Sequence, residues 1–128
     1  MSSSAFSYAT IAASLSGAIT VAFGINAILR PESGLQPFEL AYPALPADRK
    51  VVDALMVIYG VRDVLLGAGV WVAAAFANRK TVGWYTLLIG IMAFTDGLVC
   101  KYMVGQGEWN HWGYTPMVLG LGIYMSFF

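Results

Sequence analysis

Residues 51–76 read VVDALMVIYGVRDVLLGAGVWVAAAF and decide the class of the fold. A helix that crosses a membrane needs about 20 mainly apolar residues at a rise of 1.5 Å each, and this stretch supplies them. Its interior nevertheless contains two adjacent charged residues, Arg62 and Asp63. A charged side chain at that depth costs about 2.5–3.5 kcal/mol on insertion scales, so we expect both residues to find partners inside a helical bundle.

The composition of the whole chain also indicates a membrane protein. Of its 128 residues, 59% are hydrophobic and 11% are charged, whereas soluble domains carry about 25% charged residues. A chain this short cannot hide so much apolar surface in a soluble core. The net charge is +0, so nothing electrostatic attracts nucleic acid, and no nucleic-acid partner is expected. We therefore expect an integral, multi-pass membrane protein whose partner is the lipid bilayer, in the endoplasmic reticulum if the source is eukaryotic.

Four apolar segments predict an all-α fold, a four-helix transmembrane bundle that forms a single domain over residues 1–128. The expected spans are about 8–29, 51–76, 81–103 and 110–128. Two starts are open for the fourth span: helix from near Asn110, or Thr115 as N-cap with Pro116 at the first helical position. The second start leaves too few residues to cross about 30 Å of hydrocarbon.

A proline-rich loop joins the first two spans, from Arg30 to Lys50. It holds four of the five prolines and several apolar residues, among them Phe38 and Leu40. A loop of this length in a compact protein is usually functional or disordered. Because of its apolar residues, we expect it to fold over one end of the bundle.

The ionisable residues gather in the half of the bilayer next to this loop. Arg62 and Asp63 lie about 11 residues into the second span, roughly 16–18 Å below the loop face. Asp96 lies about 8 residues before the end of the third span, roughly 12 Å below the same face. Other polar or ionisable residues on this side include Asn26, Asp53, Lys101, Glu108 and His111. We take this asymmetry as the main functional signal.

The expected catalytic residues are His111 and three charged residues at membrane depth, Arg62, Asp63 and Asp96. Arg62 is predicted to pair with Asp96 or Asp63, which leaves one carboxylate to be protonated, hydrated or paired with Lys101. A carboxyl group in such a setting suits a general acid or base. The alternative is an inert buried ion pair that fixes helix register, although such pairs are weak stabilisers.

The expected site also comprises His111 and four residues expected to bind substrate. His111, the only histidine, is either a proton shuttle at the cavity mouth or a member of an interfacial aromatic belt. Tyr59 and Asn26 are expected to bind substrate, with polar packing between helices as the alternative. Lys101 and Glu108 are expected to bind substrate too, with snorkelling or solvation as the alternative.

Several kinds of site are excluded by the residues available. One histidine and one cysteine do not make a zinc site, and a haem held by two histidines of one chain is impossible. The glycines lie inside apolar segments, so they form neither a phosphate-binding loop nor a dinucleotide fingerprint. We expect no cofactor and no metal.

The chain resembles the small four-helix membrane proteins of unknown function that occur in fungi and bacteria and are distantly like DoxX-type proteins. The residues that carry the resemblance are Tyr59-Gly60-Val61-Arg62-Asp63, Gly67, Asp96 and His111-Trp112. It implies a four-helix bundle and, for some fungal members met beside natural-product genes, a role in tailoring lipophilic metabolites. Cofactor-free membrane anthrone oxygenases are a looser parallel. The resemblance supplies no reaction.

The resulting functional prediction is a cofactor-independent isomerase or cyclase that acts on a hydrophobic small molecule from the membrane. Asp96 or Asp63 would be the general base, and Arg62 would stabilise a developing enolate or alkoxide. His111 would relay the proton, and the proline-rich loop would cap the pocket. The alternatives are a non-enzymatic lipid or small-molecule carrier, a transporter subunit and a membrane scaffold. Homo-oligomerisation stays open.

Overall fold

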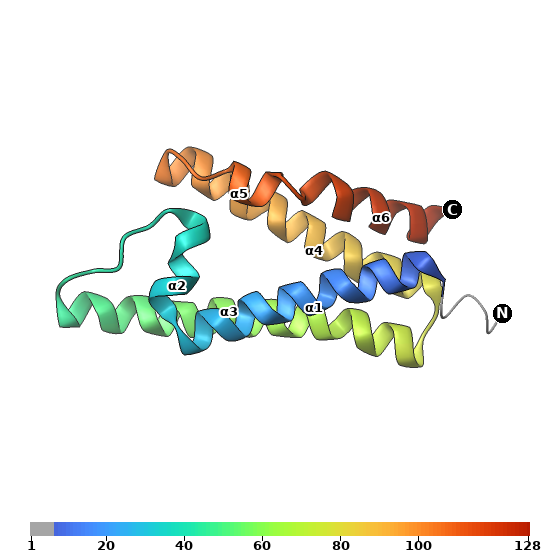
Figure 1. Ribbon diagram of the computed structural model, residues 1–128, viewed down its shortest axis with the longest axis horizontal. Coiled ribbons are helices and arrows are strands. Elements are labelled where there is room, and N and C mark those ends of the chain that lie inside the picture. Colours follow the sequence, from blue (N-terminus) through green and yellow to red (C-terminus); the bar gives the residue numbers. More distant parts are fainter. Residues whose placement is uncertain (1–6) are drawn as a thin grey trace.

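The computed structural model describes residues 7–128, and the first six residues of the expected domain lie outside that range. All regular secondary structure in residues 7–128 is helical (Figure 1). The elements in chain order are α1 (Tyr8–Leu29), α2 (Pro31–Leu35), η2 (Gln36–Phe38), α3 (Pro46–Phe76), α4 (Arg79–Val99), the π-helical turn η3 (Cys100–Val104), α5 (Trp109–Trp112) and α6 (Thr115–Phe127).

Local sequence explains where the long helices begin and end. Helix α1 has the expected bounds: the hydroxyl of Ser7 accepts the Thr10 N–H at 3.2 Å, and Pro31 follows its last turn. Helix α3 begins at Pro46, five residues before the expected 51, because proline is well suited to the first turn of a helix. Helix α4 begins two residues before the expected 81, after the Asn78 side chain, which caps it.

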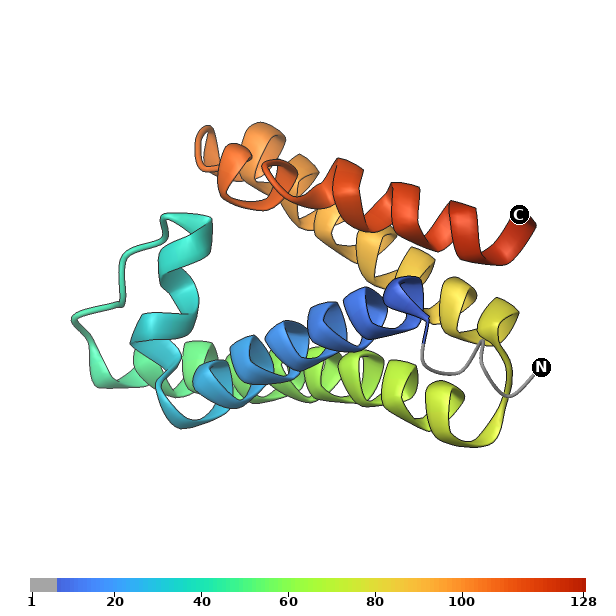
Figure 2. The same ribbon diagram turned by 45° about the vertical axis from the view of Figure 1, so that its right-hand side comes forward.

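The four long helices form two antiparallel pairs, α1 with α3 and α4 with α6. Figures 1 and 2 show the pairs close together near the α3–α4 connection and diverging toward the other end, where α2 and α5 lie. Glycines allow α1 and α3 to approach closely. A Cβ atom at Gly24 would lie 2.5 Å from the Gly60 carbonyl oxygen, and one at Gly17 would lie 2.8 Å from that of Gly67.

The segment expected to be a proline-rich loop is partly helical, since it contains α2 and η2. Its buried side chains are Leu35 and Phe38. The segment is tied to α5 by the Asn110 side-chain amide, which donates to the Pro37 carbonyl at 3.0 Å. It therefore folds back between the two helix pairs at their open end, as Figure 1 shows.

Three helices in residues 7–128 are long and apolar enough to cross a membrane: Tyr8–Leu29, Pro46–Phe76 and Arg79–Val104. They indicate a multi-pass membrane protein. The continuous span expected over 110–128 does not form, because the helix is interrupted between α5 and α6. Helix α6 starts at Thr115, with Pro116 as its second residue. Its 13 residues extend about 20 Å, which is shorter than the hydrocarbon layer of about 30 Å.

Candidate active site

The two aspartates and the arginine at membrane depth contact one another, and we call them the acid–arginine triad (Arg62, Asp63, Asp96). Arg62 donates to Asp63 Oδ1 from Nε at 3.0 Å and from Nη2 at 2.9 Å. It also donates to Asp96, from Nη1 to Oδ1 at 3.3 Å and from Nη2 to Oδ2 at 3.1 Å. One guanidinium thus bridges both acids, and the second carboxylate does not depend on Lys101.

Aromatic rings support this arrangement from the loop side. The guanidinium carbon of Arg62 lies 4.6 Å from the centre of the Tyr59 ring, one helical turn earlier on α3. Phe38 of η2 meets Tyr59 edge to face, with their ring centres 5.4 Å apart. The folded-back loop therefore holds the residue that packs against the triad.

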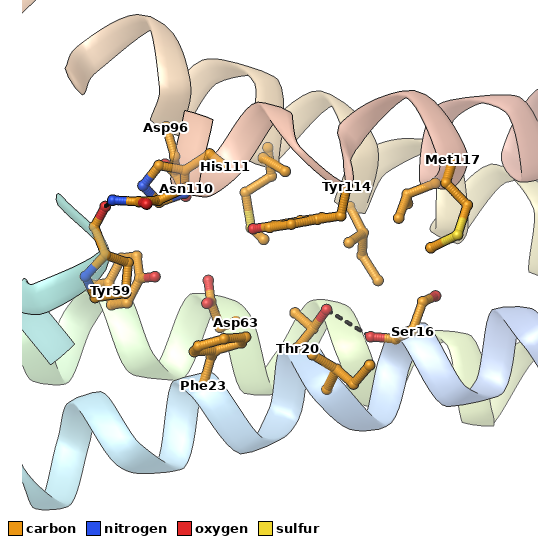
Figure 3. A pocket seen from close by; sticks show the side chains of 16 residues that line it. Ser16, Thr20, Phe23, Tyr59, Asp63, Asp96, Asn110, His111, Tyr114 and Met117 are labelled. Atoms are coloured by element: carbon orange, nitrogen blue, oxygen red, sulfur yellow. Dashed lines mark hydrogen bonds between the residues drawn. The ribbon is translucent and has the colours of Figure 1, made fainter. Parts of the chain in front are cut away.

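A cavity of about 360 Å³ lies beside the triad, between the two helix pairs. Figure 3 shows its polar end and the apolar part that continues along α1 and α6. The polar end is lined by Tyr59, Asp63, Asp96, Asn110, His111 and Tyr114; the rest is lined chiefly by Ile19, Thr20, Phe23, Ile89, Met117 and Val118. Arg62 does not line the cavity, so the cavity is bordered by the two carboxylates and not by their cation.

The two carboxylates differ in how much of their hydrogen-bonding capacity Arg62 uses. Both oxygens of Asp96 accept from Arg62, whereas only Oδ1 of Asp63 does. Figure 3 shows the Asp63 carboxylate pointing from α3 into the cavity, toward the side where Tyr114 lies. Of the two acids named as the general base, Asp63 therefore has the better geometry.

His111 lies across the cavity from Asp63, on α5 (Figure 3). The residue is 3% exposed, and its Nε2 has no hydrogen-bond partner among residues 7–128. Its ring centre is 4.7 Å from that of Phe38. Burial lowers the pKa of His111, which favours a neutral imidazole near pH 7. A buried polar atom without a partner is costly, so a ligand group at Nε2 would remove that cost.

The α1 wall of the cavity offers no free hydroxyl donor. The Ser16 hydroxyl donates to the Ala13 carbonyl at 2.7 Å. The Thr20 hydroxyl donates to the Ser16 carbonyl at 2.8 Å, the bond drawn in Figure 3. Both hydroxyls thus bond to the backbone of their own helix, and this wall behaves as a largely apolar surface.

Three expected site residues do not reach the cavity. The Asn26 side chain donates to the Ser33 hydroxyl at 3.0 Å and so ties α1 to α2. The Lys101 ammonium lies 5.6 Å from the Trp112 ring centre, and Glu108 precedes the first residue of α5. The charge or amide of each residue suggested a site, but none of the three lines the cavity.

Sequence reasoning also missed several cavity residues, chiefly Ser16, Phe23, Tyr114 and Met117. Apolar and hydroxyl side chains in a membrane helix give no chemical signal, so only the packing of α1 against α6 shows that they face one space. Within residues 7–128, no three His, Cys, Asp or Glu side chains come together as metal ligands.

A family model described as a domain of unknown function, DUF4267, matches residues 17–125, and the chain belongs to this family. The match includes the whole acid–arginine triad and His111. No curated protein and no solved structure matches the chain. Membership of a family of unknown function is thereby confirmed, whereas the likeness to DoxX-type proteins and the link to natural-product genes stay predictions.

Proposed function

We propose that this member of the DUF4267 family is a membrane enzyme that needs no cofactor and moves a proton on a lipophilic small molecule, in an isomerisation or a cyclisation. In this proposal α1, α3, α4 and α6 form a four-helix bundle in the bilayer. One observation carries the proposal: a buried carboxylate, Asp63, and an unpartnered imidazole nitrogen, His111 Nε2, border the same cavity. A base and a proton donor on opposite walls are what proton transfer within one molecule requires.

The proposed reaction begins when Asp63 takes a proton from a carbon or oxygen atom of the substrate. The electron pair left behind shifts to form a new bond within the substrate, and His111 donates a proton at the atom where charge develops. A return of the proton from Asp63 to His111 restores both groups, so the product is an isomer of the substrate. Acid–base catalysis of this kind contributes typically about 10²–10⁴-fold.

Arg62 has a different role here from the one expected from the sequence. Its N–H groups donate to both carboxylates, and it does not border the cavity. It is therefore a positioning residue, which orients Asp63 and compensates charge, and not the group that stabilises an oxyanion. A bound substrate would lie closer to the neutral donors that line the cavity than to Arg62. These donors are His111 and the hydroxyls of Tyr59 and Tyr114.

The test uses purified protein in lipid nanodiscs, a mixture of lipophilic ketones, phenols and terpenoid alcohols, and buffer made with D₂O. Liquid chromatography and mass spectrometry would report new isomers of unchanged mass and deuterium gained at carbon. We expect Asp63→Asn to lose at least about 10²-fold of the rate. Asp53→Asn is the matched control, because Asp53 lies on the same helix but bonds Tyr42 at 2.8 Å, away from the cavity.

Two outcomes would contradict the proposal. Full activity of Asp63→Asn would remove Asp63 from the mechanism. Binding of the mixture without conversion by the wild-type protein would favour the lipid or small-molecule carrier, for which the apolar length of the cavity is already suitable. Tailoring of natural products is part of the proposal only through the resemblance of the sequence, and genes beside the one for this chain would test it.

A further inference from the structure

The cavity has one exposed side, and it lies between α1 and α6. Five lining residues are exposed: Ile19 (59%) and Phe23 (45%) on α1, Met117 (70%) on α6, Tyr114 (39%) just before α6, and Asn110 on α5. At the polar end the two groups proposed to transfer the proton are buried, since Asp63 and His111 are each 3% exposed. The cavity mouth is therefore formed by mainly apolar side chains of two neighbouring helices.

The mouth lies at the depth of the hydrocarbon layer. Helix α1 has 22 residues, and Ile19 stands near its middle, about 15 Å from either end. A hydrocarbon layer of about 30 Å places such a residue close to its centre. A molecule that reaches the cavity through this mouth comes from the lipid.

We propose that the cavity binds a neutral amphiphile, an alcohol or a phenol with an apolar chain or ring system, which enters sideways between α1 and α6. Its hydroxyl group lies between Asp63 and His111, and its apolar part lies along Ile19, Phe23 and Met117. This inference rests on the proposed function, because it names the substrate class of the same site.

Charge selects the neutral hydroxyl group over an acid. The triad carries one positive and two negative charges, which sum to −1, and its cation lies outside the cavity lining. A carboxylate ligand would face two carboxylates of the protein without a cation between them, whereas a hydroxyl group can donate to Asp63. The Nε2 atom of His111 supplies the second partner, because it has none in residues 7–128.

The volume sets how much of the ligand is enclosed. At about 30 Å³ for each water-sized group, the cavity of about 360 Å³ holds about 12 non-hydrogen atoms. A longer ligand would extend through the mouth into the bilayer, where its apolar end remains solvated by lipid. The site thus suits a polar head group and the first part of a chain.

The experiment uses a long-chain alcohol with a photoreactive diazirine on its alkyl chain, added to the protein in nanodiscs at neutral pH. We expect labelling in the peptides that contain Phe23 and Met117. Dodecanol should compete with the labelling at least about tenfold better than dodecanoate, which is about 1.4 kcal/mol. Met117→Trp should reduce the labelling severalfold by filling the mouth, and Ile123→Trp is the matched control, because Ile123 is an exposed residue of α6 that does not line the cavity.

The inference is overturned if the label lies mainly on other helix faces, if dodecanoate competes as well as dodecanol, or if Met117→Trp and Ile123→Trp behave alike. These results are distinct from failure of the proposed function. Specific labelling without isomerisation or deuterium gain in any substrate would support the proposed binding site and contradict the proposed enzymatic function. Conversion of substrates together with labelling elsewhere would support the enzyme and contradict the proposed binding site.

Discussion

Replacing Arg62 by methionine isolates the electrostatic part of the acid–arginine triad. Methionine keeps much of the length of the side chain but removes all four hydrogen bonds that the guanidinium donates to Asp63 and Asp96. The two carboxylates stay where they are, 3% and 8% exposed. They would then face each other as like charges in an apolar setting without a cation.

The structure sets the size of the expected loss. Breaking a buried ion pair by removal of one partner costs about 3–5 kcal/mol, because a buried charge is left uncompensated. The Arg62 side chain is 38% exposed, so water or lipid head groups already screen part of the interaction, and we expect the lower end, about 3 kcal/mol. Each kcal/mol shifts Tm by about 4 °C in a chain of this size, so Tm should fall by about 12 °C.

Thermal unfolding in detergent, followed by circular dichroism and by aggregation, would measure this loss. Arg30→Met is the matched control, because Arg30 is exposed, and its Tm should stay within about 2 °C of the wild type. Adding Asp63→Asn and Asp96→Asn to Arg62→Met should recover most of the stability, since the uncompensated charges are then gone. A fall for Arg62→Met no larger than that of the control would show that the triad is not a coupled, buried unit.

Two other features of the structure give stability predictions. Gly24→Ala should destabilise the protein by about 1–3 kcal/mol, because the added Cβ would lie 2.5 Å from the Gly60 carbonyl oxygen; Gly120→Ala, with nothing within 4 Å, should leave stability equal or raise it by about 0.5–1 kcal/mol in the same unfolding assay. Burial lowers the pKa of His111 from its ordinary value of 6.5. As the pH falls below about 6.5, the unfolded chain therefore takes up a proton at this residue before the folded protein does, and the free energy of unfolding decreases. His111→Gln should lose less stability than the wild type between about pH 7 and pH 5, and equal slopes in unfolding at several pH values would contradict the buried, neutral imidazole.

The sequence predicts the parts of the fold that depend on apolar length and on strong stop signals. The bounds of α1 are correct because Arg30 and Pro31 end a mainly apolar run that contains no charged residue. The sequence predicts that Arg62 pairs with Asp96 or Asp63, because helix rise places Asp96 at a depth that overlaps that of Arg62 below the same face, and Arg62 bonds to both acids. The expected depth of two residues in the membrane can thus predict a contact between them, here across 34 positions of the sequence.

Other parts depend on the rotation of each helix about its axis, which the sequence does not show. The cavity lies between the helix pairs, so six of its 16 lining residues come from α1 and α6, whose side chains carry no chemical signal. Rotation also turns Arg62 away from the cavity while Asp63 faces it. The short helix that positions His111 is also tied to the folded-back loop by the bond from Asn110 to Pro37, a contact that the sequence does not show.

A label at Met117 reports whether the mouth of the charged, buried cavity opens to lipid. A nitroxide would be attached at Met117→Cys in a Cys100→Ala background, since Cys100 is the only cysteine, with exposed Lys50→Cys as the reference site. Power-saturation electron paramagnetic resonance in nanodiscs compares collisions with oxygen, which concentrates in hydrocarbon, and with a water-soluble nickel complex. We predict that oxygen collisions dominate at position 117 and nickel collisions at position 50. Nickel collisions as frequent at position 117 as at position 50 would contradict a mouth that opens to the bilayer.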